Sequence, residues 1–266
     1  MELTPIPNTP AILLKISKQN ILIVTDLHIG IETAYREAGA NIPSQTKKMI
    51  DRLYQLCADN NIDRLVLLGD IKHTVPQTSY QELEEIPELF YALEPIIDQV
   101  DIVPGNHDGN FEKYMPELEN LKINIRPSEG FKIENIGLFH GHTWPNRSLM
   151  NCDHILMGHN HPNILFTDEL GGKLYKPCWV RAKFKPEVTQ EKYSDFNPSA
   201  ELIVLPSFNQ LGTGTSINVP KQRLLGPILK NGLADMDNAR ITLLDGTYLG
   251  KLKDLQDLDL SHQNSH

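Results

Sequence analysis

Short runs of aliphatic residues recur along the chain, and each ends at a motif of glycine and polar residues. Five of them are ILIVT (21–25), LVLL (65–68), VDIV (100–103), IGLF (136–139) and HILM (154–157). Runs of this length that close on glycine are typical of buried strands ending in loops. The Pro-punctuated start, residues 2–10, indicates an edge segment or coil that leads into a further strand over residues 11–16.

Two segments have apolar residues at helical spacing. The first runs from Thr46 to Asp59, with Ser44 before it as a plausible N-cap, and its apolar positions are Met49, Ile50, Leu53, Leu56 and Cys57. The second begins near Ser79, where Ser79 and Glu82 have the spacing of a capping box. Pro87 is expected to break or restart that helix. Strands and helices alternate up to about residue 105 and strand patterns dominate afterwards, which predicts a mixed α/β protein.

The length of 266 residues is enough for one large α/β domain. We expect this domain over residues 1–250, followed by a polar, partly disordered tail over 251–266. No run approaches the roughly 18 apolar residues of a membrane span, and the N-terminus lacks a basic region followed by an apolar one. No membrane association is therefore expected.

The cysteines indicate the cellular compartment, and the net charge limits which classes of partner are expected. Cys57, Cys152 and Cys178 are odd in number and lack C-x-x-C spacing, so they read as reduced thiols of a cytoplasmic protein, outside any metal set. The net charge of −9 argues against a protein that coats nucleic acid. It does not exclude a nuclease, because the local potential near a reaction centre matters more than the charge of the whole chain.

The five strand-like runs lead into five short motifs rich in carboxylate and imidazole groups. In chain order these are Asp26-Leu27-His28, Gly69-Asp70, Gly105-Asn106-His107-Asp108, His140-Gly141 and Gly158-His159-Asn160-His161. Mn²⁺, Fe and Zn²⁺ accept both kinds of ligand, and mixed nitrogen and oxygen sets are typical of catalytic sites. Two metals about 3.5–4 Å apart need a bridging ligand, and a metal ion lowers the pKa of bound water towards roughly 7. Asp70, alone between the other motifs, is the natural bridge.

Each of these residues also has an ordinary interpretation. Asp26 and Asn106 could be turn residues, and His140 could be a half-buried histidine in the core. All five motifs in order make that series of coincidences improbable. For His154, His262 and His266 no motif surrounds the residue, so a structural or solvated role is favoured.

Residues 20–161 resemble the calcineurin-like metallophosphoesterase superfamily, whose signature runs D-x-H, G-D, G-N-H-D/E, H-G and G-H-x-H. The resemblance implies a four-layer α-β-β-α sandwich with two mixed β-sheets. It also implies two divalent ions, Mn²⁺ first, with Fe, Zn²⁺ or Ni²⁺ as alternatives. One ion would be held by Asp26, His28, Asp70 and His161, and the other by Asp70, Asn106, His140 and His159. His107 would protonate the leaving oxygen, and Asp108 would orient its ring.

Three features favour a phosphodiester substrate. His73 extends the second motif to Gly-Asp-x-x-His, which resembles SbcD-type DNA-repair nucleases, where this histidine lies near the substrate phosphate; the alternative is loop packing. His142 follows the His140 motif and could touch substrate or pack. The third is a strand in the basic stretch from residue 173 to 185, with one face formed by Trp179, Arg181, Lys183 and Lys185.

That face suits a nucleic-acid backbone, with cations for phosphates and the aromatic ring for stacking. A solvated edge strand protected by lysines explains it equally well. Residues 212–215, Gly-Thr-Gly-Thr, offer backbone N–H groups that could hold an anion, although such a run is more often a plain turn.

Together these details resemble the SbcD-related phosphoesterases of archaea, kin to a bacterial phosphoesterase found alongside an Lhr-type DNA helicase. The full SbcD-type nucleases carry a further domain and a tail that binds the ATPase SbcC. This chain ends too early for both, so that partner is not expected, whereas association with a helicase is.

The leading hypothesis is a metal-dependent phosphodiesterase, in one form a DNA endonuclease of DNA repair. The alternatives are a phosphomonoesterase, a cyclic-nucleotide phosphodiesterase, and a non-catalytic scaffold, which the intact ligand set disfavours.

Overall fold

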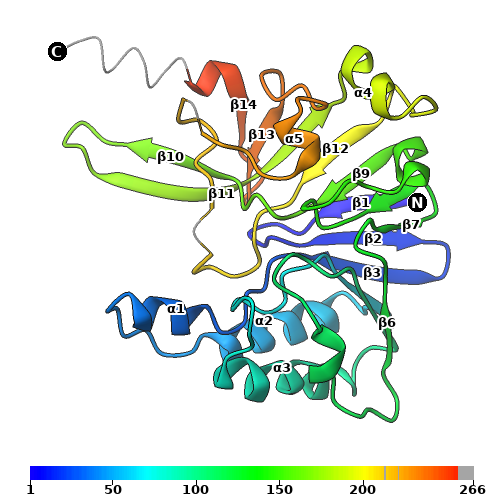
Figure 1. Ribbon diagram of the computed structural model, residues 1–266, viewed down its shortest axis with the longest axis vertical. Coiled ribbons are helices and arrows are strands. Elements are labelled where there is room, and N and C mark those ends of the chain that lie inside the picture. The colour runs from blue at the N-terminus through cyan, green and yellow to red at the C-terminus, as the bar shows by residue number, and fades with distance from the viewer. Residues whose placement is uncertain (213, 221, 257–266) are drawn as a thin grey trace. The chain divides into compact units, whose positions relative to one another are not determined.

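The first six strands pair into one mixed sheet in a computed structural model, which describes residues 1–212, 214–220 and 222–256. The sheet order follows the chain order, antiparallel from β1 to β3 and parallel from β3 to β6. Figure 1 shows β1, β2 and β3 in this order. The strands are β1 (Glu2–Pro5), β2 (Ile12–Ile16), β3 (Gln19–Val24), β4 (Arg64–Leu67), β5 (Gln99–Ile102) and β6 (Lys122–Ile125). Because β3, β4 and β5 are parallel neighbours, the three motifs that follow them lie at one edge of this sheet.

Helices pack on this sheet through its alternate side chains. They are α1 (Ile31–Glu37), α2 (Thr46–Asp59) and α3 (Tyr80–Leu93), with the 3₁₀ turn η1 at Phe111–Tyr114. Leu22, Leu65 and Val100 of the sheet share one buried cluster with Leu53 of α2 and Phe90 of α3. The period-2 and period-3.6 patterns of the sequence therefore meet in a single core.

The bounds of α2 are those predicted, but the predicted N-cap is one residue off. The capping position is Gln45, whose side chain makes no cap hydrogen bond. The Ser44 hydroxyl instead accepts from the Thr46 amide at 3.2 Å. Ser44 therefore satisfies a first-turn donor from outside the helix.

The start of α3 is confirmed, whereas the break expected at Pro87 is wrong. Ser79 and Glu82 form the predicted capping box. Pro87 lies inside the helix, which continues to Leu93. A proline here removes one backbone hydrogen bond and costs about 3 kcal/mol. The fully buried side chains on both sides of it, among them Ile86 and Phe90, stabilise the helix through tertiary packing.

The remaining strands form a second mixed sheet. Its order is β14-β13-β11-β12-β9-β8-β7, and β10 pairs with β11 in a hairpin. The strands are β7 (Phe131–Ile133), β8 (Ile136–Leu138), β9 (His154–Met157), β10 (Asn163–Thr167), β11 (Lys173–Lys183), β12 (Glu201–Val204), β13 (Arg240–Leu243) and β14 (Tyr248–Lys251). The η2 turn (Arg147–Asn151), α4 (Pro186–Lys192) and α5 (Pro227–Lys230) contribute side chains to the core of this sheet.

Each sheet belongs to its own compact unit. The first unit comprises residues 1–6, 11–128 and 208–212, and the second comprises residues 7–10, 129–207 and the described residues from 214 onward. The mixed α/β class with two mixed sheets is thus confirmed. The domain bounds of 1–250 stay a prediction. Of the predicted tail, residues 252–256 are helical, with Leu252 in the core of the second unit, and residues 257–266 lie outside the described part.

Over the described residues, no helix is long and apolar enough to cross a membrane. The three cysteines are buried free thiols. Burial raises the pKa of the Cys57 thiol to about 12 and raises those of Cys152 and Cys178 as well. These thiols are therefore protonated at neutral pH, which makes them poor metal ligands.

Candidate active site

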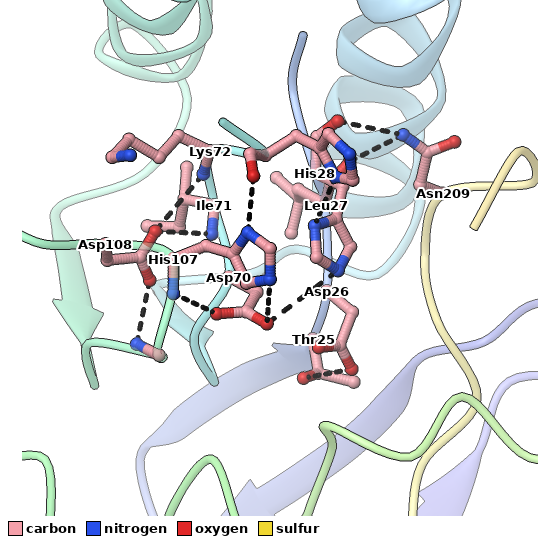
Figure 2. Close-up of polar contacts among 12 residues, drawn as sticks. Thr25, Asp26, Leu27, His28, Asp70, Ile71, Lys72, His107, Asp108 and Asn209 are labelled. Atoms are coloured by element: carbon pink, nitrogen blue, oxygen red, sulfur yellow. Dashed lines mark hydrogen bonds and ion pairs between the residues drawn. The ribbon is translucent and has the colours of Figure 1, made fainter. Parts of the chain in front are cut away.

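The loops that follow β3 and β4 run side by side in the first unit. The Asp26 amide donates to the Gly69 carbonyl at 3.1 Å, and the His28 amide donates to the Asp70 carbonyl at 2.8 Å. Backbone pairing thus continues beyond the strands into the motifs themselves. It fixes Asp26, His28 and Asp70 next to one another (Figure 2).

Asp108 ties the loop after β5 to the loop after β4. One carboxylate oxygen accepts from the amides of Ile71 at 2.8 Å and Lys72 at 3.2 Å, and the other accepts from the Gly105 amide at 2.8 Å. Asp108 was expected to orient the His107 ring. The structure instead gives it a backbone role: charge-assisted hydrogen bonds hold two ligand loops together.

The Asp70 carboxylate lies at the centre of this arrangement and is 2% exposed. Its Oδ1 accepts from the His107 amide at 2.9 Å, and its Oδ2 lies 3.8 Å from Nε2 of His28 and 3.9 Å from Nε2 of His107. A Cβ at position 105 would lie 2.1 Å from Oδ1, so only glycine fits there. Gly105 of the third motif is therefore required by the close approach of Asp70.

The rings of His28, His73 and His107 form one cluster. The Nδ1 atoms of His73 and His28 are 3.2 Å apart, and the rings of His73 and His107 stack with centroids 5.5 Å apart. Nδ1 of His107 is hydrogen-bonded to the His73 carbonyl. That carbonyl, not Asp108, therefore orients the His107 ring and leaves its Nε2 towards Asp70 (Figure 2).

Two buried charged residues that the sequence analysis did not place at the site hold the His73 loop. Glu82, fully buried, accepts from the His73 amide at 2.8 Å and the Thr74 amide at 2.5 Å. The Lys72 ammonium, also fully buried, donates to the carbonyls of Thr74 and Gln77. The capping-box spacing pointed to Glu82, but only as a helix cap.

The second unit brings three histidines together at the ends of β8 and β9, which are parallel neighbours. Ring centroids are 5.0 Å apart for His140 and His159, 5.3 Å for His140 and His142, and 6.2 Å for His142 and His159. The Gly158 amide donates to the His140 carbonyl at 3.0 Å, so the two loops are paired through the backbone. His142 thus lies beside two predicted ligands.

Uncharged contacts support the loop of His159 and His161. The side chain of Asn160 accepts from the Leu225 amide at 2.8 Å and donates to the Leu225 carbonyl at 3.2 Å. A Cβ at Gly214 would lie 1.6 Å from the His161 carbonyl oxygen. Gly214 belongs to the Gly-Thr-Gly-Thr run, so its role is close packing against the His161 backbone.

The predicted ligands share an unusual backbone conformation. Five of the nine described non-glycine residues with positive φ belong to the ligand motifs, and their φ angles are 57°, 44°, 50°, 68° and 42° for Asp26, His28, Asp70, His159 and His161 respectively. A left-handed backbone costs a side-chain-bearing residue roughly 1–2 kcal/mol. Such strain clusters at functional sites, where surrounding contacts impose it.

A family model described as calcineurin-like phosphoesterase matches residues 19–185, which is more than half of the chain. The chain belongs to the calcineurin-like phosphoesterase family. It is 34% identical over 90 residues to a probable cyclic nucleotide phosphodiesterase of Vesicomyosocius okutanii subsp. Calyptogena okutanii, over 34% of each chain. The match therefore spans about a third of that relative's length.

Two solved structures are similar to this calcineurin-like phosphoesterase. The crystal structure of Pseudomonas putida nuclease MPE is 20% identical, covering 92% of this chain and 98% of the other, with a TM-score of 0.49. YfcE, a phosphoesterase from E. coli, is 16% identical, covering 87% of this chain and 97% of the other, with a TM-score of 0.35.

The donor set of this phosphoesterase fits a divalent metal. Asp26 and Asp70 are buried carboxylates beside the imidazole of His28, and such oxygen and nitrogen donors suit Mn²⁺, Fe and Zn²⁺. The His28 Nε2 and Asp70 Oδ2 atoms lie 3.8 Å apart. The other nitrogen of His28, Nδ1, lies 3.2 Å from Nδ1 of His73.

The predicted strand from Trp179 to Lys185 matches the end of β11 only as far as Lys183, and Lys185 instead lies at the N-cap of α4. Val180 and Ala182 face the core, so the alternation is confirmed. Trp179, however, is only 3% exposed, so the expectation of an aromatic ring open to a stacking base is wrong. Arg181 pairs with Glu201 at 3.2 Å, and the Lys183 ammonium donates to the Ser199 carbonyl at 2.7 Å. Arg181 and Lys183, which were expected to meet phosphates, therefore already have partners on neighbouring segments.

Proposed function

We propose that this phosphoesterase is a hydrolase of phosphodiester bonds that requires two divalent ions, with Mn²⁺ favoured over Fe, Zn²⁺ and Ni²⁺. One ion would be held by Asp26, His28, Asp70 and His161, and the other by Asp70, Asn106, His140 and His159. The observation that carries the proposal is the left-handed backbone at five of these seven residues. Strain repeated at predicted ligands supports a functional demand on their geometry.

The ions, when bound, supply positive charge to the phosphate oxygens and lower the pKa of a bound water to about 7. The chain supplies the proton for the leaving oxygen. With its Nδ1 on the His73 carbonyl, His107 has Nε2 available as the proton donor. The Asp70 carboxylate lies 3.9 Å from the same Nε2. His73 and His142 are proposed to contact the substrate phosphate.

The diester preference rests on His73, whose position beside His28 and His107 is close enough for a role at phosphorus. Within that preference, a DNA endonuclease of the SbcD-related branch that acts in repair beside a helicase is the first candidate. The second is a cyclic-nucleotide phosphodiesterase, supported by the name of the relative that matches 90 residues. A phosphomonoesterase ranks third, because nothing in the cluster selects for a terminal phosphate.

One set of assays tests these alternatives. The metal-stripped protein is reloaded with Mn²⁺, Fe²⁺, Zn²⁺ or Ni²⁺ and incubated with bis-p-nitrophenyl phosphate, p-nitrophenyl phosphate, cyclic AMP, and linear or circular DNA. We expect diesters to be hydrolysed faster than the monoester, and cleavage of circular DNA to identify an endonuclease. Hydrolysis of the monoester alone would reject the diester proposal.

A pair of histidine substitutions provides the control. His140→Gln should abolish turnover, whereas His154→Gln should retain it, because His154 lies at the other end of β9 and pairs with Glu201. If no metal supports hydrolysis of any of these substrates, the enzymatic proposal fails.

A further inference from the structure

A cavity of about 280 Å³ lies in the first unit, between the first two turns of α2 and residues 208–211. Its lining residues are Gln45, Lys48, Met49, Arg52, Phe208, Asn209, Gln210 and Leu211. The volume is close to the lower end of the roughly 300–1,000 Å³ that small-molecule sites occupy. It therefore has room for one compact organic group, not for a folded segment or a duplex.

The charges in this cavity are all of one sign. Lys48 and Arg52 are basic, and none of the eight lining residues is acidic, although the chain as a whole carries a net charge of −9. Burial lowers the pKa of the Arg52 guanidinium, which marks it as partly removed from water. A partly desolvated cation gains more from an anion than a solvated one does.

The rest of the lining suits a flat ring. The Arg52 guanidinium lies over the Phe208 ring, 5.1 Å from its centroid, and such planes stack on nucleobases as they do on aromatic side chains. Met49 and Leu211 add apolar walls. The Gln45 amide orients the Lys48 side chain, because its Oε1 accepts from the Lys48 ammonium at 3.1 Å while its Nε2 donates to the Pro43 carbonyl at 2.7 Å. The lining thus combines groups for a phosphate with groups for a base.

One wall of the cavity also holds a metal-ligand loop. The Asn209 amide nitrogen donates to the Leu27 carbonyl at 2.7 Å and to the His28 carbonyl at 3.3 Å (Figure 2). The Phe208 amide donates to the Thr25 carbonyl at 2.9 Å. A group bound in the cavity therefore contacts the same segment that positions His28.

We propose that this cavity binds a nucleoside phosphate unit, with the phosphate near Lys48 and Arg52 and the base against the Arg52 and Leu211 side chains. The proposal deepens the proposed function, on which it rests, by assigning a subsite for one nucleotide of the substrate. The unit can come from a free nucleotide or from a nucleic-acid strand, since both carry the same chemistry.

Binding to the metal-free protein tests the cavity apart from catalysis. AMP, adenosine and inorganic phosphate are titrated calorimetrically into the full chain in EDTA. AMP should bind more tightly than either fragment, because the lining has partners for both halves. Lys48→Glu and the cavity-filling Leu211→Trp should each weaken AMP binding about tenfold, the effect of losing one charge-assisted contact or its space.

Lys47→Glu is the matched control, because Lys47 is exposed on the same turn of α2 and does not line the cavity. It should bind AMP as the wild type does. Equal AMP affinity in wild type, Lys48→Glu and Leu211→Trp would overturn the proposal, as would inorganic phosphate binding as tightly as AMP. Lys48 is exposed, so its substitution does not threaten folding.

The source of the nucleotide is read from competition and kinetics. A short single-stranded oligonucleotide that displaces AMP identifies a strand as a source, and displacement by cyclic AMP alone identifies a free nucleotide. In the metal-loaded enzyme, Lys48→Glu should lower kcat/KM for a dinucleotide more than for bis-p-nitrophenyl phosphate. Loss of AMP binding in Lys48→Glu with no turnover of any substrate would refute the proposed function and leave the cavity assignment standing.

Discussion

The two units hold their predicted ligands by different means. In the first unit, carboxylates accept from the backbone amides of the ligand loops: Asp108 from three amides, and Glu82 from those of His73 and Thr74. In the second unit, the support is the neutral amide of Asn160 and the close packing of Gly214 on the His161 carbonyl. Both units keep ligands in the left-handed region. Buried carboxylates are therefore part of the support in the first unit, whereas these contacts in the second unit are neutral.

The difference predicts how each unit responds to substitution. A carboxylate can be replaced by an amide of nearly the same shape, which removes charge and one acceptor and leaves packing intact. A glycine that touches a carbonyl has no such substitute, because even one methyl group overlaps it. Among the supporting residues, replacing a carboxylate of the first unit should therefore cost less than adding a methyl group at Gly214.

The largest expected effect is at Asp70, the centre of the first unit's cluster. Asp70→Asn retains an oxygen that can accept from the His107 amide, so the fold should survive. It should abolish hydrolysis and weaken binding of both metals, because a neutral amide bridges two cations poorly. Elemental analysis measures the metal bound by the variant, and circular dichroism shows whether its fold survives. Two metals retained at wild-type affinity would contradict the bridging role.

The next effect concerns His107. Replacing it by Ala should leave metal content unchanged and slow substrates with poor leaving groups by roughly 10²–10⁴-fold, the usual contribution of a general acid. A nitrophenolate needs little protonation, so bis-p-nitrophenyl phosphate should suffer less. The ratio of the two kcat values is the measurement. Equal losses of kcat on both kinds of substrate would contradict the proton-donor role of His107 but not the metal-ligand assignment.

Gly214→Ala tests the steric support of the second unit. The added Cβ would lie 1.6 Å from the His161 carbonyl oxygen, so the loop must shift. Displacing the support of a ligand generally costs about 10–100-fold in metal affinity or activity. Gly109→Ala is the control, since nothing lies within 4 Å of that Cβ and its φ is not positive. Identical metal affinity in both variants would show that the packing at Gly214 is dispensable.

Glu82→Gln tests the charged support of the first unit. The new amide group places a donor where the carboxylate accepts from His73, Thr74 or Ser79. One buried mismatch of this kind costs about 1–3 kcal/mol. Thermal unfolding should show that loss, together with a smaller fall in activity as His73 loosens. Glu88→Gln, exposed on the same helix, should change neither. A native melting temperature for Glu82→Gln would mean that the His73 loop is held by other contacts.

The features that could be predicted from the sequence depend mostly on residues close together in the chain. Strand positions, the bounds of α2 and the Ser79–Glu82 capping box follow from periodicity and short spacings, and the structure confirms them. Continuation of α3 through Pro87 did not follow, because packing from outside the helix outweighs the lost hydrogen bond. The same holds for the site. The ligands form short motifs that can be recognised in the sequence, whereas Gly214 is required because it packs against His161, which lies 53 positions away.

The burial of Trp179 could not be predicted either, because alternation distinguishes the two faces of a strand but does not show which face is covered. The same limit applied to the cations beside it. Their spacing suggested a series of phosphate contacts. The partners that they have, Glu201 and Ser199, come from the next strand and the turn before it, and only strand pairing brings them alongside.

The smallest expected effect is on that strand. Replacing Arg181 and Lys183 together by Ser removes one partly exposed ion pair and one exposed hydrogen bond, so the free energy of unfolding should fall by only about 1 kcal/mol or less. Because both cations already have partners, the slope of log K against log salt for DNA should stay unchanged. A slope that falls by about 0.7–0.9 for each cation removed would show that they contact phosphates after all. Hydrolysis of bis-p-nitrophenyl phosphate, measured on the same protein, separates such a loss of strand binding from damage to the site itself.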